Sequence, residues 1–205
     1  MQDVTVVVPA YNEEGRIGPV VEELTGTYRV LVVDDGSTDR TATEACEAGA
    51  TVVEQPVNRG YIAALKRGFR EAETAIVVTY DADGEHRPEH VRRVAEPIGT
   101  HNLDLVLGTR SRVPRPSERL LNRLTRLRVD VTDSGTGLRA LRRDLAVELE
   151  LDTVCTCGTL VLEATAKGAR IGEVPIETRE IDKQRSIAWG HARQLLHVLR
   201  YLRNV

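Results

Sequence analysis

Five runs of mostly β-branched apolar residues alternate with stretches of helical periodicity, and this alternation constrains the fold more than any other feature. The runs occupy residues 4–9, 29–34, 51–54, 75–80 and 103–108. They are nearly continuous in apolar residues, which is typical of strands covered on both faces. Helices are predicted between them over residues 13–25, 38–48, 61–72 and 88–98. The pattern predicts an α/β fold with a mainly parallel sheet of the nucleotide-binding kind.

The second half of the chain is less regular, and it contains no linker or internal repeat. We expect an amphipathic helix, a strand, a helix, a strand and a terminal helix over residues 117–130, 138–142, 158–167, 170–177 and 188–202. A chain of 205 residues is of one-domain size, so we predict a single domain over residues 1–205.

The net charge of −3 hides a strongly basic segment at residues 110–130. Residues 110–128 contain seven arginines and one acid, so they carry +6 and the remainder carries −9. Leucines 120, 121, 124 and 127 recur at helical spacing among these arginines. The segment is interpreted either as a membrane-surface helix that meets anionic headgroups or as a helix packed on the domain by its leucines. No stacking aromatics interleave the arginines, so we expect no nucleic-acid partner.

The composition predicts a cytoplasmic protein. No stretch approaches the ~18 consecutive apolar residues of a membrane span, and the first residues lack a secretory pattern. Cys46, Cys155 and Cys157 are an odd number without metal-site spacing, so they are interpreted as reduced and structural.

The strongest candidates for functional residues are the aspartates at the ends of two predicted strands. Asp81 and Asp83 form an Asp-x-Asp directly after an apolar strand, where two carboxylates can meet a divalent cation and phosphate oxygens. A solvated turn is the alternative. Asp34 and Asp35 follow the second strand, where a carboxylate can accept hydrogen bonds from a ribose or a base. The chain has neither Gly-x-Gly-x-x-Gly nor a P-loop, which disfavours a dehydrogenase and a phosphotransferase.

Seven collinear motifs over residues 4–180 resemble family 2 glycosyltransferases, most closely the dolichyl-phosphate mannose and glucose synthases. The motifs are VVVPAYNEE (6–14), VVDDGSTDRT (32–41), NRGYIAALKRGF (58–69), YDADGEHRPEH (80–90), LGTR (107–110), DSGTGLR (133–139) and GEVPIETR (172–179). The resemblance implies a GT-A fold, an inverting transfer of a hexose from a UDP- or GDP-linked sugar, and Mg²⁺ or Mn²⁺. The Gln-x-x-Arg-Trp motif of processive synthases is absent, which argues against polymer formation.

The resemblance also implies roles for single residues. The nucleotide would be bound by Pro9, Tyr11, Glu13, Asp34 or Asp35, and Asp81. The metal would be bound by Asp81 and Asp83, with Glu85 nearby and His86 as an added candidate ligand. Asp83, Arg110 and Arg139 are the candidate catalytic residues, the two arginines acting on the donor diphosphate or an acceptor phosphate. Asn58 and Gly60 would be structural.

The acceptor follows from the basic segment. An alcohol acceptor needs a general base, for which Asp133 and Glu163 are the candidates, whereas a lipid phosphate is already an anion. We expect a polyprenyl phosphate acceptor, reached at the cytoplasmic membrane surface through Arg112, Arg119 and Arg123. The alternatives are a soluble acceptor, such as a phosphorylated small molecule, and a non-catalytic nucleotide-sugar binding protein.

Overall fold

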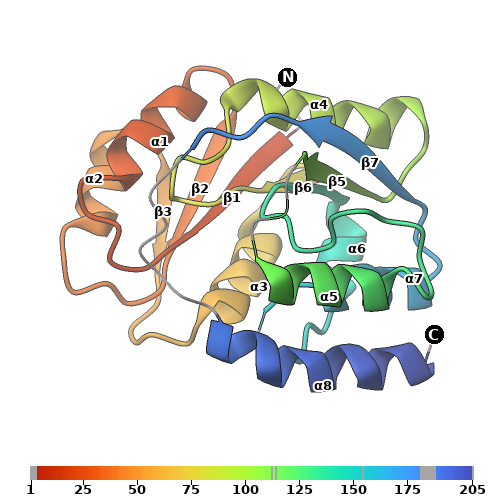
Figure 1. The fold of residues 1–205 in the computed structure, drawn as a ribbon. Helices are drawn as coiled ribbons and strands as arrows, with labels where there is room; N and C mark the ends of the chain where they lie inside the picture. The colour runs from red at the N-terminus through yellow and green to blue at the C-terminus, as the bar shows by residue number, and fades with distance from the viewer. Residues whose placement is uncertain (1–3, 112, 114, 154, 181–187, 205) are drawn as a thin grey trace.

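A seven-stranded sheet organises the protein (Figure 1). The computed structural model describes residues 4–111, 113, 115–153, 155–180 and 188–204. The strands are β1 (Val4–Ala10), β2 (Arg29–Asp34), β3 (Thr51–Glu54), β4 (Ile76–Thr79), β5 (Leu105–Arg110), β6 (Arg139–Arg142) and β7 (Ile171–Ile176), in the order β3-β2-β1-β4-β6-β5-β7. Only β6 runs antiparallel to its neighbours among the described strands. The predicted α/β fold with a mainly parallel sheet is confirmed.

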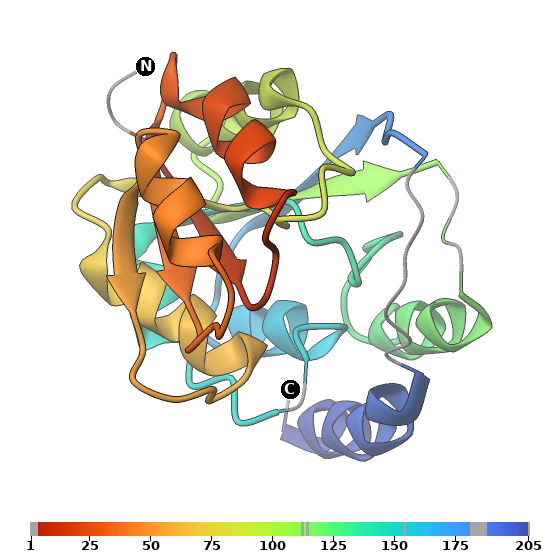
Figure 2. The same ribbon diagram turned by 90° about the vertical axis from the view of Figure 1, so that its left-hand side faces the viewer.

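Helices cover both faces of the sheet (Figure 2). They are α1 (Ile17–Thr25), α2 (Thr41–Glu47), α3 (Tyr61–Glu71), α4 (Pro88–Thr100), α5 (Pro116–Thr125), α6 (Arg143–Glu148), α7 (Thr159–Ala166) and α8 (Ala188–Asn204). Val6 and Val8 of β1 pack against α1, α2 and α4, while Val7 packs on the opposite face with α3, α6 and α7. The alternation of side chains along a strand therefore builds two apolar layers from one continuous apolar run.

The first helix begins four residues later than predicted, at Ile17. The backbone N–H of Glu13 donates to Thr41 Oγ1 at 2.8 Å, and that of Gly15 donates to Glu44 Oε2 at 2.7 Å. Gly15 has φ +77°, a left-handed conformation that glycine adopts at little cost. Side chains of α2 thus bind the amides of this turn, and residues 13–16 stay outside the helix.

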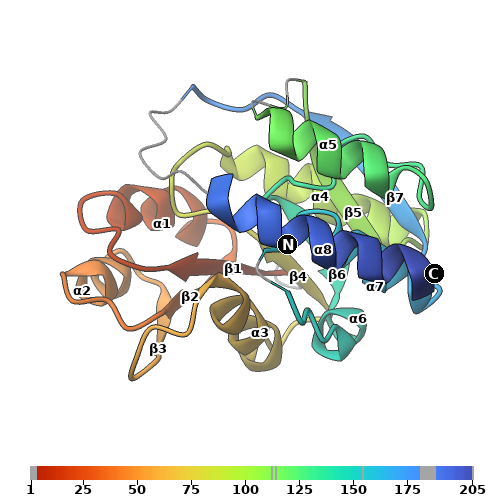
Figure 3. The ribbon, with the colours of Figure 1, turned by 60° about the horizontal axis from the view of Figure 1, so that its bottom comes forward.

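The leucines of α5 and of the residues just after it lie partly in the core and partly on the surface. Leu121 and Leu124 pack against α7 and α8, whereas Leu120 and Leu127 are 50% and 69% exposed. The predicted helix over 117–130 ends at Thr125. Figure 3 shows α8 lying alongside α5. The described part of the chain has no helix that is long and apolar enough to span a membrane.

Candidate active site

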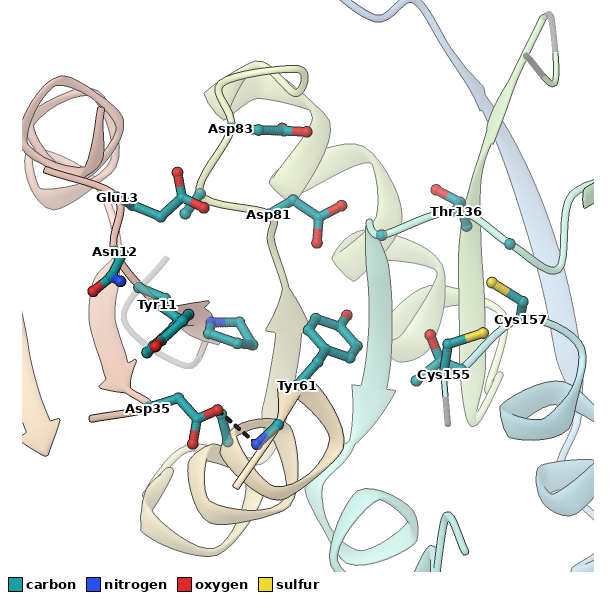
Figure 4. Close-up of a pocket in the computed structure, with 18 of the residues that line it drawn as sticks. Tyr11, Asn12, Glu13, Asp35, Tyr61, Asp81, Asp83, Thr136, Cys155 and Cys157 are labelled. Atoms are coloured by element: carbon teal, nitrogen blue, oxygen red, sulfur yellow. Dashed lines mark hydrogen bonds between the residues drawn. The ribbon is translucent and has the colours of Figure 1, made fainter. Parts of the chain in front are cut away.

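A cavity of about 630 Å³ opens at the carboxyl ends of β1 and β4 (Figure 4). The chain passes from β1 to β2 and from β4 to β5, which lie in opposite directions along the sheet, and such a switch point is where open α/β sheets bind ligands. The lining falls into two parts. The N-terminal lining comes from residues 9–83, and the C-terminal lining consists of Arg115, Gly135, Thr136, Gly137, Arg139, Cys155, Thr156 and Cys157.

The loop after β1 brings Pro9, Tyr11 and Glu13 to the cavity, where the sequence predicted a nucleotide. Asn12 holds this loop: its N–H donates to Ser37 Oγ at 2.9 Å, and its Oδ1 accepts the N–H of Thr38 at 3.0 Å. The loop after β2 therefore fixes the loop after β1. Tyr11 and Glu13 line the cavity as a result, and their nucleotide-binding role stays a prediction.

The two aspartates after β2 have different roles. Asp34 accepts hydrogen bonds from the N–H and the hydroxyl of Ser37 and does not line the cavity, and its nucleotide-binding role stays a prediction. Asp35 does line the cavity. Its carboxylate accepts from the N–H of Arg59 at 2.8 Å and of Gly60 at 2.7 Å, which ties this loop to the start of α3. Of the two aspartates, Asp35 is the one that lines the cavity, and its nucleotide-binding role stays a prediction.

Tyr61, the first residue of α3, points into the cavity between the two linings (Figure 4). Burial raises the pKa of its phenol well above the usual range, the carboxylate of Asp81 raises it further, and the guanidinium of Arg139 opposes the rise. The phenol is therefore a neutral hydrogen-bond donor at physiological pH. The sequence analysis missed Tyr61, although the tyrosine directly after Gly60 in the Asn-Arg-Gly-Tyr motif was the available signal.

The loop after β4 gathers a set of metal-ligand atoms. Carboxylate oxygens of Asp81 and Glu85 and a ring nitrogen of His86 lie within 4.8 Å of one another. Tyr80 packs edge-on against the His86 ring, with 5.6 Å between ring centroids, and its hydroxyl donates to the His86 carbonyl at 2.7 Å. Two carboxylates and one imidazole fit a divalent cation such as Mn²⁺, while an all-oxygen set is what Mg²⁺ prefers.

Asp83 also lines the cavity but lies outside this three-residue group. Its Oδ1 accepts the N–H of Glu85 at 3.0 Å, so the carboxylate shapes the turn that presents Glu85. Its predicted metal-binding and catalytic roles stay predictions.

Arg139 is the most unusual group of the C-terminal lining. It begins β6 between Thr79 of β4 and Leu107 of β5, and its side chain is fully buried. Nε, Nη1 and Nη2 make no hydrogen bond of normal geometry to the described residues, and the phenol of Tyr61 is the polar group that lies near the guanidinium. A buried cation without such hydrogen bonds costs free energy, so it points to an anion that the cavity is built to receive. Arg139 is where the sequence predicted a phosphate-binding arginine.

Arg110, by contrast, does not line the cavity. Its guanidinium donates to Asp133 at 2.7 and 3.0 Å and to Glu118 at 3.1 Å, all within a buried cluster. Burial alone would raise the pKa of Asp133, but the hydrogen bonds and charge of Arg110 hold it below its usual range. Its donors are used to join β5, α5 and the loop before β6, and its catalytic role stays a prediction.

Replacing Arg110 with methionine is expected to lower the free energy of unfolding by about 3–5 kcal/mol, because it leaves the buried Asp133 without its cation and takes one of two arginines from the buried Glu118. Urea denaturation at pH 7 measures the change. Arg126→Met is the matched control, since Arg126 pairs only with the fully exposed Asp130 at 3.8 Å and should cost less than about 1 kcal/mol. Equal losses in the two variants would contradict the structural role of Arg110.

Neither candidate base faces the cavity. Asp133 is bound by Arg110, and Glu163 accepts hydrogen bonds from the N–H groups of Glu150 and Leu151 and from the Tyr201 hydroxyl at 3.1 Å. Both carboxylates are buried away from the lining. The described C-terminal lining contains no carboxylate at all.

Two of the three predicted acceptor arginines, Arg119 and Arg123, are not among the residues that line the cavity. Arg119 and Arg123 are exposed on α5, and Arg119 Nε donates to the Val113 carbonyl at 3.1 Å. Arg112 lies outside the described residues. Arg115 is the arginine of this segment that reaches the lining, and it also pairs with Glu118 at 2.8 Å.

Cys155 and Cys157 form one wall of the cavity together with Thr156 (Figure 4). A hydrogen bond from Cys157 lowers the pKa of the Cys155 thiol, burial opposes this shift, and the charge of Arg139 adds to it. The thiols are not joined in a disulfide. The sequence analysis interpreted this pair as structural, because nothing in the spacing along the chain indicates that both cysteines line the cavity with Arg139.

The sheet and its covering helices have the fold of the GT-A class of glycosyltransferases. Residues 5–159, more than half of the chain, match the family model described as glycosyl transferase family 2. The protein belongs to this family, and the prediction from the sequence motifs is confirmed.

Relatives of known name include two archaeal proteins. A UDP-N-acetylglucosamine–dolichyl-phosphate N-acetylglucosaminyltransferase of Methanococcus voltae is 30% identical over 84% of this chain and 84% of its own length. A dolichyl-phosphate hexose transferase of Haloferax volcanii is 32% identical over 87% of this chain and 83% of its own. A solved structure of glucosyl-3-phosphoglycerate synthase from Mycobacterium tuberculosis, with Mn²⁺, UDP and phosphoglyceric acid, superposes with a TM-score of 0.82 at 25% identity, covering 97% of this chain and 77% of that one.

Proposed function

We propose that the protein transfers a hexose, with inversion, from a nucleotide-sugar to the phosphate of a polyprenyl phosphate. The observation that carries the proposal is the buried guanidinium of Arg139, which faces the cavity and makes no hydrogen bond of normal geometry to the described residues. A phosphate monoester would supply the missing acceptor atoms, and arginine's planar fork suits two of its oxygens.

The N-terminal lining would bind the donor. Tyr11, Glu13 and Asp35 surround the space for the nucleoside, and Asp81, Glu85 and His86 would hold a divalent cation against the diphosphate. When bound, this cation supplies charge neutralisation for the departing nucleotide. The neutral Tyr61 phenol would donate a hydrogen bond at the boundary between donor and acceptor.

The C-terminal lining favours an acceptor that is already ionised. An alcohol must lose a proton as it attacks, but the described residues of this lining include no carboxylate, and the Asp81 carboxylate that lies against Gly137 is assigned to the cation. A phosphate oxygen needs only to be positioned. It would attack the anomeric carbon from the face opposite the nucleotide, forming one C–O bond as the C–O bond to the nucleoside diphosphate breaks and the electron pair leaves with that group. The names of the two archaeal relatives support the same acceptor class.

A soluble acceptor is the second candidate, because structural neighbours bind phosphoglyceric acid. The two candidates share an ionised phosphate and differ in the attacking atom, which is a phosphate oxygen in the lipid and a hydroxyl oxygen in phosphoglycerate. The deciding experiment offers UDP- and GDP-linked hexoses with Mn²⁺ to polyprenyl phosphate, polyprenol and phosphoglycerate in turn. We expect product from polyprenyl phosphate alone. Product from phosphoglycerate alone would replace the lipid by the soluble acceptor, and no product from any acceptor would remove the proposal.

A membrane-bound acceptor requires the protein to reach the membrane surface. Leu120 on α5 and Leu127 just after this helix are exposed among exposed arginines, and the neighbouring α8 exposes Leu196 and Leu199. Only part of the predicted leucine face is therefore available, since Leu121 and Leu124 are packed in the domain. Apolar side chains flanked by arginines are typical of helices that lie on anionic bilayers.

Replacing Arg119 and Arg123 with glutamate is expected to weaken binding to anionic liposomes roughly tenfold or more, since each cation near such a surface contributes ~1 kcal/mol. Sedimentation with vesicles of anionic and neutral lipid at low and high salt measures the effect. Arg40→Glu with Arg92→Glu is the matched control, because these arginines are exposed elsewhere on the surface. An equal loss in the control pair would mean that net charge, and not α5, determines binding.

A further inference from the structure

Gln194 of α8 is a polar side chain that is fully buried and makes a dense set of hydrogen bonds. Its Oε1 accepts from the Thr153 hydroxyl at 2.6 Å and from the N–H of Cys155 at 3.2 Å. Its Nε2 lies 2.8 and 2.9 Å from the carbonyl oxygens of Cys155 and Cys157 and 3.0 Å from Thr159 Oγ1. Because donors face Oε1 and carbonyl oxygens face Nε2, the side-chain amide of Gln194 can take only one of its two flipped orientations.

These partners belong to one wall of the cavity. We name Cys155, Thr156 and Cys157 the thiol wall, since all three residues line the cavity beside Arg139. Gln194 binds this wall through backbone atoms, so it does not depend on the wall's side chains. It does not line the cavity itself.

Helix α8 is well placed to hold the thiol wall. Val198, one helical turn beyond Gln194, is fully buried and packs with Leu121 of α5 and Leu162 of α7. Gly158 directly follows the thiol wall and has φ +78°. A Cβ at this position would lie 2.7 Å from Thr125 Oγ1 of α5 and 3.1 Å from Val198. The wall is therefore pinned between α5 and α8 at a point where only glycine fits.

We infer that Gln194 is a positioning residue, which fixes the thiol wall at the acceptor side of the cavity from the outer helix α8. Replacing its amide frees the backbone of Cys155 and Cys157 while leaving the N-terminal lining untouched. The acceptor side of this inference rests on the proposed function, but the effect on the thiol wall does not.

The alkylation rates of the two thiols measure how firmly the thiol wall is held. In a Cys46→Ser background, which removes the exposed cysteine, the alkylation rates of Cys155 and Cys157 by iodoacetamide are followed by mass spectrometry. We expect Gln194→Met to raise these rates at least tenfold, because methionine fills the space without hydrogen bonds. Arg193→Met, the same substitution at the adjacent exposed residue, should leave them within twofold. Unchanged rates in Gln194→Met would overturn the inference.

Kinetics and ligand binding separate positioning from a general loss of stability. We expect Gln194→Met to raise the acceptor KM about tenfold or more and to leave the affinity for UDP with Mn²⁺ within twofold. Equal losses of donor and acceptor binding would overturn the positioning role. If the methionine variant does not fold, Gln194→Asn, which keeps the amide on a shorter side chain, is measured in the same way. Failure of the wild type to use polyprenyl phosphate would remove the proposed function, while the alkylation rates would still decide the role of Gln194.

Discussion

Replacing Arg139 with methionine is expected to lower transfer to polyprenyl phosphate by a factor on the order of 100 or more, and to leave the protein at least as stable as the wild type. Charge-assisted hydrogen bonds contribute roughly 1.5–3 kcal/mol each, and the variant loses all those that Arg139 makes to a bound anion. A buried cation without a hydrogen-bond partner costs the folded state, so an apolar side chain of similar length removes that cost. Turnover assays and thermal denaturation measure the two effects.

Arg142, three residues along the same strand, offers a control with the opposite outcome. Its guanidinium binds Asp104 and Asn102 at 3.0 Å, away from the cavity. Arg142→Met should therefore lower the melting temperature and preserve turnover of the folded protein. If Arg139→Met instead destabilised the protein and kept its turnover, Arg139 would be a structural residue and the anion site would lie elsewhere.

Replacing Asp81 with asparagine is expected to abolish the gain in UDP affinity that Mn²⁺ provides, and to lower transfer by a factor of roughly 1,000. The variant removes a charged ligand from the group that Asp81 forms with Glu85 and His86. Isothermal titration with UDP, in Mn²⁺ and in EDTA, measures the metal-dependent part. Glu85→Gln should act in the same direction. If only Asp83→Asn removed the metal dependence, the cation would be held by Asp83.

Gly137 allows the same site to be tested without changing a ligand. A Cβ at Gly137 would lie 1.8 Å from Asp81 Oδ2, so Gly137→Ala must displace that carboxylate. The displaced group is the end of a mobile side chain, and we therefore expect a weaker metal dependence with little loss of stability. Gly99→Ala is the control, since a Cβ there meets no atom within 4 Å.

The strands were predictable because continuous β-branched runs have few alternatives in an α/β domain. The direction of β6 was not, since its four residues show no periodicity and its antiparallel pairing is set by β4 and β5. The start of α1 was misplaced for a related reason. Its preceding amides are bound by Thr41 and Glu44, which lie 28 and 29 residues further along the chain.

The candidate site was partly predictable for the same physical reason. Strand ends place carboxylates at the sheet edge, so local sequence was enough to bring Asp35 and Asp81 to the cavity. An arginine side chain is longer than that of an aspartate, so the role of its guanidinium depends on which distant groups it contacts. Arg110 meets Asp133 and Glu118, whereas Arg139 makes no hydrogen bond of normal geometry to the described residues, and the motifs alone do not distinguish the two cases.

The division of the cavity lining at residues 83 and 115 makes the domain modular for protein engineering. All N-terminal lining residues precede α4, and all C-terminal lining residues follow β5. A single crossover within residues 88–104 would therefore exchange one contiguous half of the cavity for that of another family member. Under the proposed function, such chimaeras would combine the nucleotide-sugar preference of one parent with the acceptor preference of the other.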